Sequence, residues 1–342
     1  MEMPMRKYGV LIVGAGWVSG AHISAFQKDP RAKIVAIQSR RSESAQAQIQ
    51  ANGLTDCKIY TDYAQALADP RVDIVVICTP NDLHCEQAIL AAQAGKHLLI
   101  EKPAALCWED AQRMAKEIEF AGVRSLVGYV LHFNSLFMTA KNLQEQFLGE
   151  IQYAETDYFH RVEDDISCYH WNRTKKVGGS SLLAGGCHAV DAMRWFMQED
   201  VESVYAQSMR IRDDFEFPGT SIVLLRFRSG KIAKIGSSYD FISPYVFNLR
   251  LCGTKGTLWN DKLWSPQELS GQLDYVTLPV TLPNSANVSH HPFPQQASHL
   301  LDCIERGVET NCPMSDALKT QEVIAAADRS AQTGQPVSLP LR

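Results

Sequence analysis

Short apolar runs alternate with amphipathic stretches over the first 130 residues of the chain. The runs have the length of β-strands, and several lack polar positions, which is typical of strands buried on both faces. They lie at residues 8–13, 33–39, 58–61, 73–79, 97–101 and 125–130. The stretches between them carry the hydrophobic spacing of helices and lie at residues 19–28, 42–51, 83–94 and 108–121. Strands that alternate with helices through short links predict an α/β domain with a doubly wound parallel sheet.

The pattern changes near residue 129. A helix is predicted at residues 135–147, and longer strand-like runs follow it without helices between them. These runs lie at residues 151–160, 201–209, 221–227, 231–241 and 247–254. Successive strands predict an antiparallel or mixed sheet, and residues 228–230 predict a hairpin turn within it.

The change of pattern divides the chain into two predicted domains. The first covers residues 1–128, and the second, an α+β domain, covers residues 129–342. The second ends in a helix at about residues 316–333, and packing of this helix back on the first domain stays open.

Composition narrows the class of protein. The 342 residues carry a net charge of −5 and are 45% hydrophobic, so nothing favours general binding to nucleic acid or to anionic membranes. No apolar run approaches the roughly 20 residues that a membrane span requires, and the N-terminal segment does not have the pattern of a signal peptide. Nine cysteines occur without a CxxC pair, which favours the reducing cytoplasm. No metal site is predicted, since His290 and His291 are adjacent and are expected to face different ways.

A turn with two glycines joins the first predicted strand to the first predicted helix. Gly14 allows a tight turn, and Gly16 allows a pyrophosphate to approach the backbone at the helix N-terminus. The third glycine of the GxGxxG pattern is replaced by Ser19, which is small enough for close packing of helix and strand. This strand–turn–helix context predicts dinucleotide binding, with Trp17 and Val18 among the contacts, and a purely structural turn is the alternative.

The end of the second predicted strand bears on the choice between NAD and NADP. An acidic residue there would bind the ribose hydroxyls of NAD, but this chain has Ser39, Arg40 and Arg41. A serine can donate to a 2′-phosphate, and an arginine can pair with it and stack on adenine. We therefore expect NADP rather than NAD. The alternative is that both arginines are solvated and that NAD binds without an acidic anchor.

Polar residues also follow the fourth and fifth predicted strands. Since the carboxyl ends of parallel strands line the cofactor crevice, Thr79, Pro80 and Asn81 are predicted nicotinamide contacts. His84 is grouped with these cofactor residues, and we expect it to cap or pack rather than to catalyse. Lys102 follows the fifth strand, where a charged side chain is costly unless it is used. A surface lysine at a strand end is the alternative.

Four motifs, in this order and spacing, resemble the glucose–fructose oxidoreductase / inositol dehydrogenase / MocA (Gfo/Idh/MocA) family. They are "VGAGWVSGAH", "TPNDLH", "GKHLLIEKPAAL" and "GGCHAVD", and the likeness covers essentially the whole chain. The resemblance implies a Rossmann domain followed by an α+β domain with a large, open, mostly antiparallel sheet. It also implies NAD(P)-dependent hydride transfer at a carbinol or carbonyl carbon of a sugar, polyol or sugar derivative. A homodimer or homotetramer formed through the open sheet is implied as well.

The resemblance assigns roles to Glu101, Lys102 and Pro103, which match the family's EKP motif. The Lys102–Pro103 bond is expected to be cis. Lys102 is the expected catalytic residue that points its ammonium group at the substrate oxygen and the nicotinamide ribose, and Glu101 is counted with the cofactor contacts.

His188 matches the histidine that serves many family members as general acid and base. An imidazole suits this role because it can take and return a proton near neutral pH. The alternative is a histidine that only caps or packs at the start of a helix. Many sugar and inositol dehydrogenases carry an aspartate four residues earlier, where this chain has Ala184, so its proton relay is expected to differ in detail. Asp191 is interpreted as scaffold.

Aromatic residues of the second domain are the remaining substrate candidates. Tyr129, Tyr169 and Trp171 are predicted substrate contacts together with His188, the tryptophan by stacking on a sugar. Since tyrosines replace the relay in some relatives, Tyr129, Tyr158 and Tyr169 are unranked candidates for that role. Three other functions stay open: an NAD-dependent glycosidase that uses transient oxidation, a non-enzymatic sugar or nucleotide sensor, and a reductase of an imine or tetrapyrrole.

Overall fold

The computed structural model describes residues 7–164, 166, 168–284 and 291–341. They group into two compact units. The first unit holds the chain up to residue 129 together with residues 292–318, and the second holds residues 130–291 and the chain from residue 319 onward. The sequence pattern assigns residues 292–318 to the second domain, whereas in the structure they group with the first unit.

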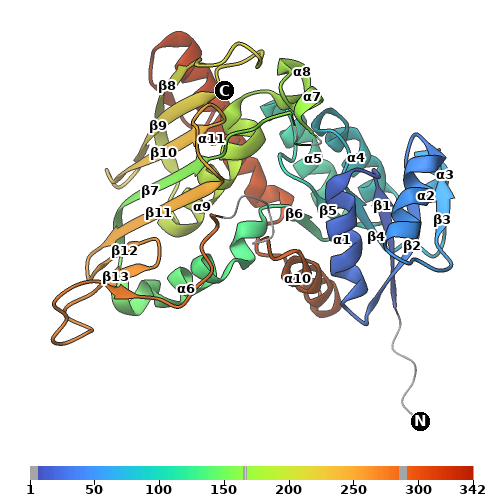
Figure 1. The fold of residues 1–342 in the computed structure, drawn as a ribbon, viewed down its shortest axis with the longest axis horizontal. Helices are drawn as coiled ribbons and strands as arrows, with labels where there is room; N and C mark the ends of the chain where they lie inside the picture. Colours follow the sequence, from blue (N-terminus) through green and yellow to red (C-terminus); the bar gives the residue numbers. More distant parts are fainter. Residues whose placement is uncertain (1–6, 165, 167, 285–290, 342) are drawn as a thin grey trace. The chain divides into compact units, whose positions relative to one another are not determined.

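The first unit is built on a six-stranded parallel sheet in the order β3-β2-β1-β4-β5-β6 (Figure 1). Its strands are β1 Tyr8–Val13, β2 Ala32–Gln38, β3 Lys58–Tyr60, β4 Ile74–Ile77, β5 His97–Ile100 and β6 Ser125–Val127. Its helices are α1 Trp17–Gln27, α2 Ser42–Ala51, α3 Tyr63–Leu67, α4 His84–Gln93, α5 Trp108–Ala121 and α10 Phe293–Arg306. The predicted doubly wound parallel sheet is confirmed. Its strand order reverses between β1 and β4, and ligands of such sheets bind at the carboxyl ends of strands beside the reversal.

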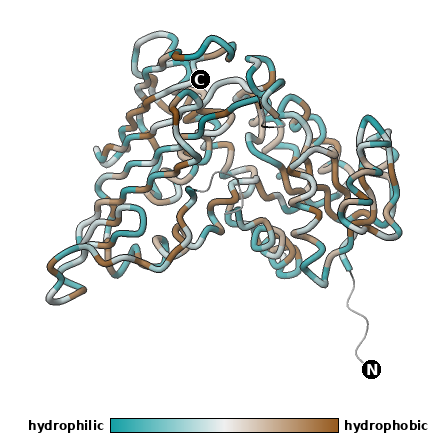
Figure 2. Tube along the Cα trace, in the orientation of Figure 1, coloured by the Kyte–Doolittle hydropathy of each residue, from teal (hydrophilic) through white to brown (hydrophobic). Residues whose placement is uncertain are grey.

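The two central strands form the apolar centre of this unit. Every residue from Val10 to Val13 and from Ile74 to Ile77 is completely buried, and Figure 2 colours these strands brown for hydrophobic. Burial on both faces explains why their sequences show no polar alternation.

Two elements of the first unit differ from the predicted bounds. Helix α1 begins at Trp17, two residues before the predicted start, because Gly16 is already its N-cap. The sequence pattern does not predict α3, since five residues are too few to show a helical period. Its start is fixed locally by the Asp62 carboxylate, which accepts from the Gln65 N–H at 2.8 Å.

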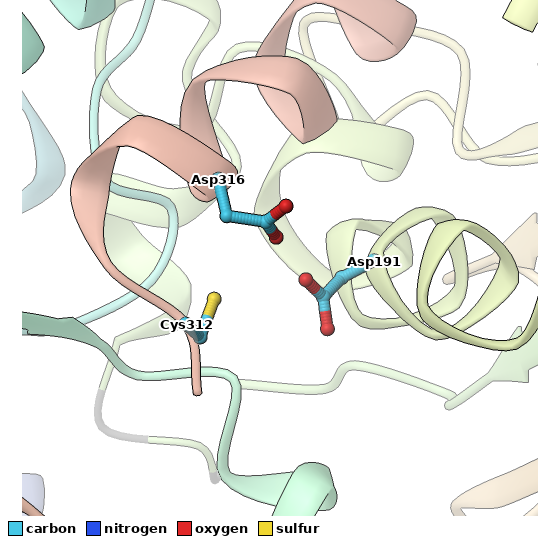
Figure 3. Close-up of side chains that lie close together, drawn as sticks. All are labelled: Asp191, Cys312 and Asp316. Atoms are coloured by element: carbon cyan, nitrogen blue, oxygen red, sulfur yellow. The ribbon is translucent and has the colours of Figure 1, made fainter. Parts of the chain in front are cut away.

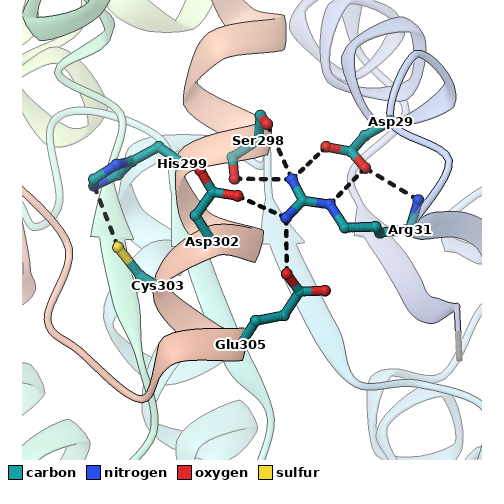
Figure 4. Close-up of polar contacts among 7 residues, drawn as sticks. All are labelled: Asp29, Arg31, Ser298, His299, Asp302, Cys303 and Glu305. Carbon is teal, nitrogen blue, oxygen red and sulfur yellow. Dashed lines mark hydrogen bonds and ion pairs between the residues drawn. The ribbon is translucent and has the colours of Figure 1, made fainter. Parts of the chain in front are cut away.

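Arg31 joins α10 to the turn between α1 and β2 (Figure 4). Its guanidinium donates to Asp302 at 2.6 Å and Glu305 at 2.9 Å on α10, and to the Ser298 hydroxyl at 3.0 Å. On the other side it donates twice to Asp29, at 2.7 and 2.9 Å. The hydrogen bonds from Arg31 hold the pKa of the Asp29 carboxyl below its ordinary value. This fan of charge-assisted hydrogen bonds ties a helix from late in the chain to the first unit.

The second unit is built on a nine-stranded sheet in the order β14-β13-β12-β11-β7-β10-β9-β8-β15. Its strands are β7 Ile151–Phe159, β8 Val201–Met209, β9 Thr220–Phe227, β10 Ile232–Ser238, β11 Val246–Gly253, β12 Thr257–Trp259, β13 Lys262–Trp264, β14 Val276–Thr277 and β15 Val337–Ser338. Strands β7 and β10 pair in parallel, and the other pairs among the described strands of this sheet are antiparallel. The predicted mostly antiparallel sheet is confirmed, and the predicted hairpin joins β9 to β10 with Gly230 at φ +90°.

Helix α9 (Cys187–Met197) packs on β7 and β10 and covers one face of this sheet. The Thr156 hydroxyl on β7 donates to the Ala189 carbonyl on α9 at 2.9 Å. The other α-helices among the described residues of the unit are α6 Ser135–Leu143, α7 Tyr169–Asn172, α8 Lys175–Gly178 and the greater part of α11 Met314–Thr333. Alternate residues of β9 and β10 point away from α9, and Ile222, Leu224 and Ile232 are 41%, 53% and 55% exposed.

A membrane span requires a long and apolar helix. Across the residues that the structure describes, none of the helices is both long enough and apolar enough to cross a membrane.

Replacing Arg31 by methionine is expected to lower the free energy of unfolding by about 2 kcal/mol, because Asp29 and the α10 acids lose their shared donor. Urea and thermal unfolding of the purified protein measure this loss. Lys33→Met is the matched control, since Lys33 pairs with Asp56 at 2.6 Å but both side chains are exposed. A much smaller loss is expected there, because solvent screens an exposed pair. Equal losses in the two variants would contradict the role given to Arg31.

Candidate active site

The glycine turn after β1 leaves open space at the N-terminus of α1. Gly14 has φ +98°, and a Cβ there would lie 2.7 Å from the Cys78 carbonyl oxygen, so this position requires glycine. A Cβ at Gly16 would meet no atom within 4 Å. The N–H groups of the first helical turn together with this space fit the pyrophosphate of a dinucleotide. Trp17 is 59% exposed at the first helical position, and Val18 beside it is half-buried.

Ser19 stands where a third glycine is common. Its side chain is completely buried, and its hydroxyl donates to the Gly16 carbonyl at 2.5 Å. The serine therefore fits inside the turn and closes it with a hydrogen bond, which supports the interpretation that this departure from GxGxxG is mild.

Ser39, Arg40 and Arg41 follow β2 directly. Ser39 is half-buried, and both arginines are exposed. Within the described part of the chain, the Arg40 and Arg41 guanidinium groups form no hydrogen bond or ion pair. Both guanidinium groups therefore lie at the end of β2 without a carboxylate partner among the described residues. An arginine in this state can pair with a phosphate.

The segment after β4 is anchored by side-chain hydrogen bonds. The Thr79 hydroxyl donates to Gln87 on α4 at 2.6 Å, Asn81 is buried, and Pro80 is half-buried. His84 is completely buried, with Nδ1 2.9 Å from the Pro103 carbonyl oxygen and Nε2 2.9 Å from that of Thr79. Burial lowers the pKa of the His84 imidazole, although both carbonyl groups favour its protonated form. His84 therefore packs inside the unit.

Lys102 leaves β5 in a turn that opens with a cis Lys102–Pro103 bond, as expected. Glu101 before it is buried, and its carboxylate accepts from His22 Nε2 at 2.7 Å and from the Lys102 backbone N–H at 3.2 Å. Burial raises the pKa of the Glu101 carboxyl, but these hydrogen bonds and the positive charge of Lys102 outweigh it and hold the pKa below its ordinary value. A Cβ at Gly128 would lie 3.2 Å from the Lys102 nitrogen, so a glycine at the end of β6 lets the turn approach.

His188 lies on α9 of the second unit, directly after a π-helical turn at Leu182–Gly186. A Cβ at Gly185 would lie 2.6 Å from both Tyr158 Cε1 and the Tyr239 hydroxyl oxygen, and one at Gly186 would lie 2.6 Å from the Ser237 hydroxyl oxygen. The two glycines thus serve close packing of the turn against the sheet. They place the N-terminus of α9, and His188 with it, over β7 and β10.

Aromatic and imidazole rings surround His188. Tyr158 on β7 stacks on it with ring centroids 6.1 Å apart, and His291 lies at 6.2 Å. Tyr245 contacts both Tyr158, at 5.1 Å, and His291, at 6.1 Å. The structure therefore shows one of the three tyrosine candidates, Tyr158, as a neighbour of His188. The sequence gives no signal for Tyr245 or His291, and His290 lies outside the described residues.

Three other residues are predicted substrate contacts, namely Tyr169, Trp171 and Tyr129. The Tyr169 hydroxyl donates to Asp214 at 2.6 Å, which engages it in a local hydrogen bond. Trp171 is half-buried on α7. Tyr129 is buried and is the last residue of its segment of the first unit.

Asp191 forms a buried pair with His132. Its Oδ2 lies 2.6 Å from His132 Nε2, and the His132 ring stacks on Trp195 at 4.2 Å. This pair supports the interpretation of Asp191 as scaffold. Figure 3 shows Asp191 on α9 and, in the first unit, Cys312 before α11 and Asp316 in its first turn.

Two segments of the chain match the profiles of one family. Residues 8–129 match GFO_IDH_MocA, an oxidoreductase family with an NAD-binding Rossmann fold, and residues 137–259 match the GFO/IDH/MocA C-terminal domain. Together with the parallel sheet and its glycine turn, these matches define a dinucleotide-binding oxidoreductase. The chain belongs to the Gfo/Idh/MocA family, which confirms the resemblance seen in its motifs.

Relatives in this family act on varied hydroxyl compounds. The myo-inositol 2-dehydrogenase of Thermotoga maritima is 27% identical over 260 residues, covering 74% of this chain and 75% of that protein. The D-xylose 1-dehydrogenase (NADP(+)) 2 of Haloferax volcanii is 26% identical over 311 residues, covering 90% and 92%. The structure of the WlbA dehydrogenase from Bordetella pertussis, in complex with NADH and UDP-GlcNAcA, is 28% identical with a TM-score of 0.82, covering 98% and 99%.

A half-buried acid, Asp328, contacts the segment that leads to His188. Asp328 on α11 accepts from the Ser180 hydroxyl at 2.9 Å, and the Ser180 oxygen accepts from the Leu183 N–H at 3.1 Å. Burial raises the pKa of the Asp328 carboxyl to about 6. The folded protein therefore binds this proton more tightly than the unfolded chain, and the stability that the proton contributes is lost as the pH rises through about 6.

Asp328→Asn is expected to remove the loss of stability that accompanies deprotonation of this carboxyl. Between about pH 4 and 6 the wild type should lose stability that the variant keeps, so at pH 7.5 the variant should be more stable by about 1 kcal/mol. Urea unfolding at a series of pH values measures the difference. Asp82→Asn, at an acid of the first unit that is exposed, is the control. Parallel pH profiles for wild type and Asp328→Asn would contradict the assignment.

Proposed function

We propose that the protein transfers a hydride between a bound nicotinamide and a carbinol or carbonyl carbon of a sugar, polyol or sugar derivative. The observation that carries the proposal is the placement of Lys102. It follows β5 at the carboxyl edge of the sheet. At the same edge β1 leads into the glycine turn, and β4 leads into the segment that contains Thr79. Parallel sheets of this type bind their ligands at this edge, so a cation there is placed to contact a bound ligand.

Lys102 would act on the substrate oxygen. In the oxidative direction its ammonium group binds the hydroxyl oxygen and stabilises the negative charge that develops as the proton leaves. The turn that carries Lys102 is held by the Glu101 carboxylate through its hydrogen bond to the Lys102 N–H. A group held in advance loses little freedom when the substrate binds.

His188 would take the hydroxyl proton and return it in the reverse direction. Burial raises the pKa of Tyr158, Tyr239 and Tyr245, so these phenols stay protonated near neutral pH and do not act as bases. An imidazole remains the group of this cluster that is suited to proton transfer at that pH. We infer that His188 and Lys102 serve one substrate.

The residues of the first unit fit a nicotinamide dinucleotide. The Gly14–Val18 turn would hold its pyrophosphate, while Thr79, Pro80, Asn81, Glu101 and Lys102 would surround its nicotinamide end. When bound, the nicotinamide supplies the acceptor or donor of the hydride.

We propose that NADP is the preferred cofactor. The exposed Arg40 and Arg41 side chains and the Ser39 hydroxyl at the end of β2 support this, because they match a 2′-phosphate and no acid occupies these three positions. The relatives include both choices, since one enzyme is named for NADP(+) and one complex contains NADH.

The relatives bear on the substrate class, and the exposed face of the large sheet bears on the assembly. Relatives named for myo-inositol and D-xylose, and a complex with UDP-GlcNAcA, favour a small hydroxyl-rich molecule. Ile222, Leu224 and Ile232 on the exposed face of the large sheet support a homodimer or homotetramer formed there. Nine free cysteines support a place in the cytoplasm.

Lys102→Ala is expected to lower kcat by about 10³-fold, because the developing charge on the substrate oxygen loses its partner. The substrate is first found by screening inositols, aldoses and sugar acids for reduction of NAD and NADP. Cofactor binding, followed by protein fluorescence, should survive in the variant. Lys96→Ala is the matched control, since Lys96 precedes the opposite end of β5 and donates to the Val72 carbonyl at 2.8 Å.

Three results would contradict this assignment. Wild-type turnover in Lys102→Ala would remove Lys102 from the mechanism. Cleavage of a glycoside with no net reduction of bound cofactor would establish a glycosidase. Full biological activity of Lys102→Ala without any turnover would establish a sensor.

The paired variant Arg40→Ala/Arg41→Ala is expected to weaken NADPH binding by about 30-fold, because charge-assisted hydrogen bonds to the 2′-phosphate are lost. NADH binding should stay nearly unchanged, since NADH lacks that phosphate. Titration of both cofactors against protein fluorescence makes the comparison. Lys116→Ala, at an exposed cation on α5, is the control. Tighter binding of NADH than NADPH by the wild type would overturn the proposed preference.

A further inference from the structure

Two completely buried histidines hold the turn that carries Lys102. His22 comes from α1 and His84 from the start of α4, so they reach the turn from two different helices. His22 contacts Glu101 before the cis bond, and His84 contacts Pro103 after it. Neither histidine has a role in the chemistry proposed above.

His22 bonds the turn through one ring nitrogen. Its Nε2 lies 2.7 Å from Glu101 Oε1, while its buried Nδ1 has no hydrogen-bond partner among the described residues. An N–H at Nδ1 would lose its hydrogen bond to water without replacement, so the proton of the neutral ring belongs on Nε2. The edge-to-face contact with Phe293, at 4.9 Å and 73°, fixes the plane of the ring.

His84 bonds the turn from the other side and connects it to β4. Its ring bridges the Pro103 carbonyl and the Thr79 carbonyl, each at 2.9 Å. The two segments that would contact the nicotinamide are thereby joined through one side chain. A neutral imidazole donates to one of these two carbonyls at a time, whereas the protonated ring donates to both.

The turn needs such support because it has little regular structure. Residues 101–107 form neither helix nor strand, and Pro103 has no N–H to donate. The Lys102 N–H is bonded to the Glu101 carboxylate, which His22 in turn holds. The position of the Lys102 backbone therefore depends on side chains that come from α1 and α4.

We propose that His22 and His84 are positioning residues for Lys102, which fix the lysine-bearing turn against α1 and against the segment after β4. This inference rests on the proposed role of Lys102 in hydride transfer. It assigns function to two histidines, at residues 22 and 84, that touch neither substrate nor hydride.

The test compares variants that remove or keep the hydrogen bonds. His22→Leu and His84→Leu are each expected to lower kcat by about 10- to 100-fold, because a reacting group displaced by about 1 Å loses that much. The KM for the substrate and the Kd for NADPH should change by less than about three-fold, as for an interaction used mainly in the transition state. His22→Gln should recover most of the loss, since a glutamine amide can donate to Glu101.

His97→Leu is the matched control in the same unit. His97 begins β5, and its Nδ1 accepts from the Arg124 N–H at 3.0 Å, away from the Lys102 turn. Its removal should lower the melting temperature while kcat stays near wild type. Losses of kcat in His97→Leu as large as those in the other two variants would overturn the proposal.

A second measurement reports on Lys102 without turnover. Brief acetylation with acetic anhydride, followed by mass spectrometry, gives the rate for Lys102 relative to the other lysines. We expect this relative rate to change at least about two-fold in His22→Leu and His84→Leu, since the environment of the ammonium changes with the turn. An unchanged rate and an unchanged kcat would overturn the proposal. If neither leucine variant folds, Glu101→Gln carries the same test, with the same expected losses and the same contrary outcome.

A comparison of Lys102→Ala with the two histidine variants separates this proposal from the proposed function. If Lys102→Ala keeps full turnover, the role of Lys102 is wrong, and with it the positioning of a catalytic group. If Lys102→Ala loses turnover while the histidine variants keep both kcat and the acetylation rate, only the positioning proposal is wrong.

Discussion

The carboxylate of Glu101, buried at the carboxyl end of β5, is the group on which the geometry of the first unit depends. A buried charge is costly unless its oxygens receive hydrogen bonds, and here His22 and the Lys102 N–H supply them. The requirement links α1, β5 and the turn after β5, because moving any one of them leaves the carboxylate unsatisfied. The same contact that satisfies the charge also sets where Lys102 leaves the strand.

The second unit positions its histidine by close packing instead of by charge. Gly185 and Gly186 leave no room for a side chain between the π-helical turn and the tyrosines and Ser237 of the sheet. A turn packed this tightly has few alternative positions, since protein interiors do not deform continuously. A hydrogen-bonded charge in the first unit and a steric limit in the second thus each fix the backbone from which a candidate catalytic side chain leaves.

The sequence predicts the strands and most helices well because burial imposes a period on them. Strand β1, helix α2 and helix α5 match their predicted bounds, and the glycine turn and the cis bond lie where the motifs indicate. Partners distant in the chain could not be predicted in this way. His22 meets a carboxylate 79 residues away and His84 a carbonyl 19 residues away, and a hydrophobic period reports only which face is buried. The attachment of α10 to the first unit through Arg31 could not be predicted for the same reason, because Arg31 and its partner Glu305 are 274 residues apart in the chain.

Ala184 changes what the surroundings of His188 can do. An aspartate there would place a negative charge beside the imidazole and favour its protonated form. This chain instead places rings around His188, with Tyr158 stacked at 6.1 Å and His291 at 6.2 Å. Rings exclude water and offer faces for the C–H groups of a sugar, but they stabilise an imidazolium less than a carboxylate does. Under the proposed function, the substrate oxygen, which becomes negative as its proton leaves, would be the group that balances the charge of a protonated His188.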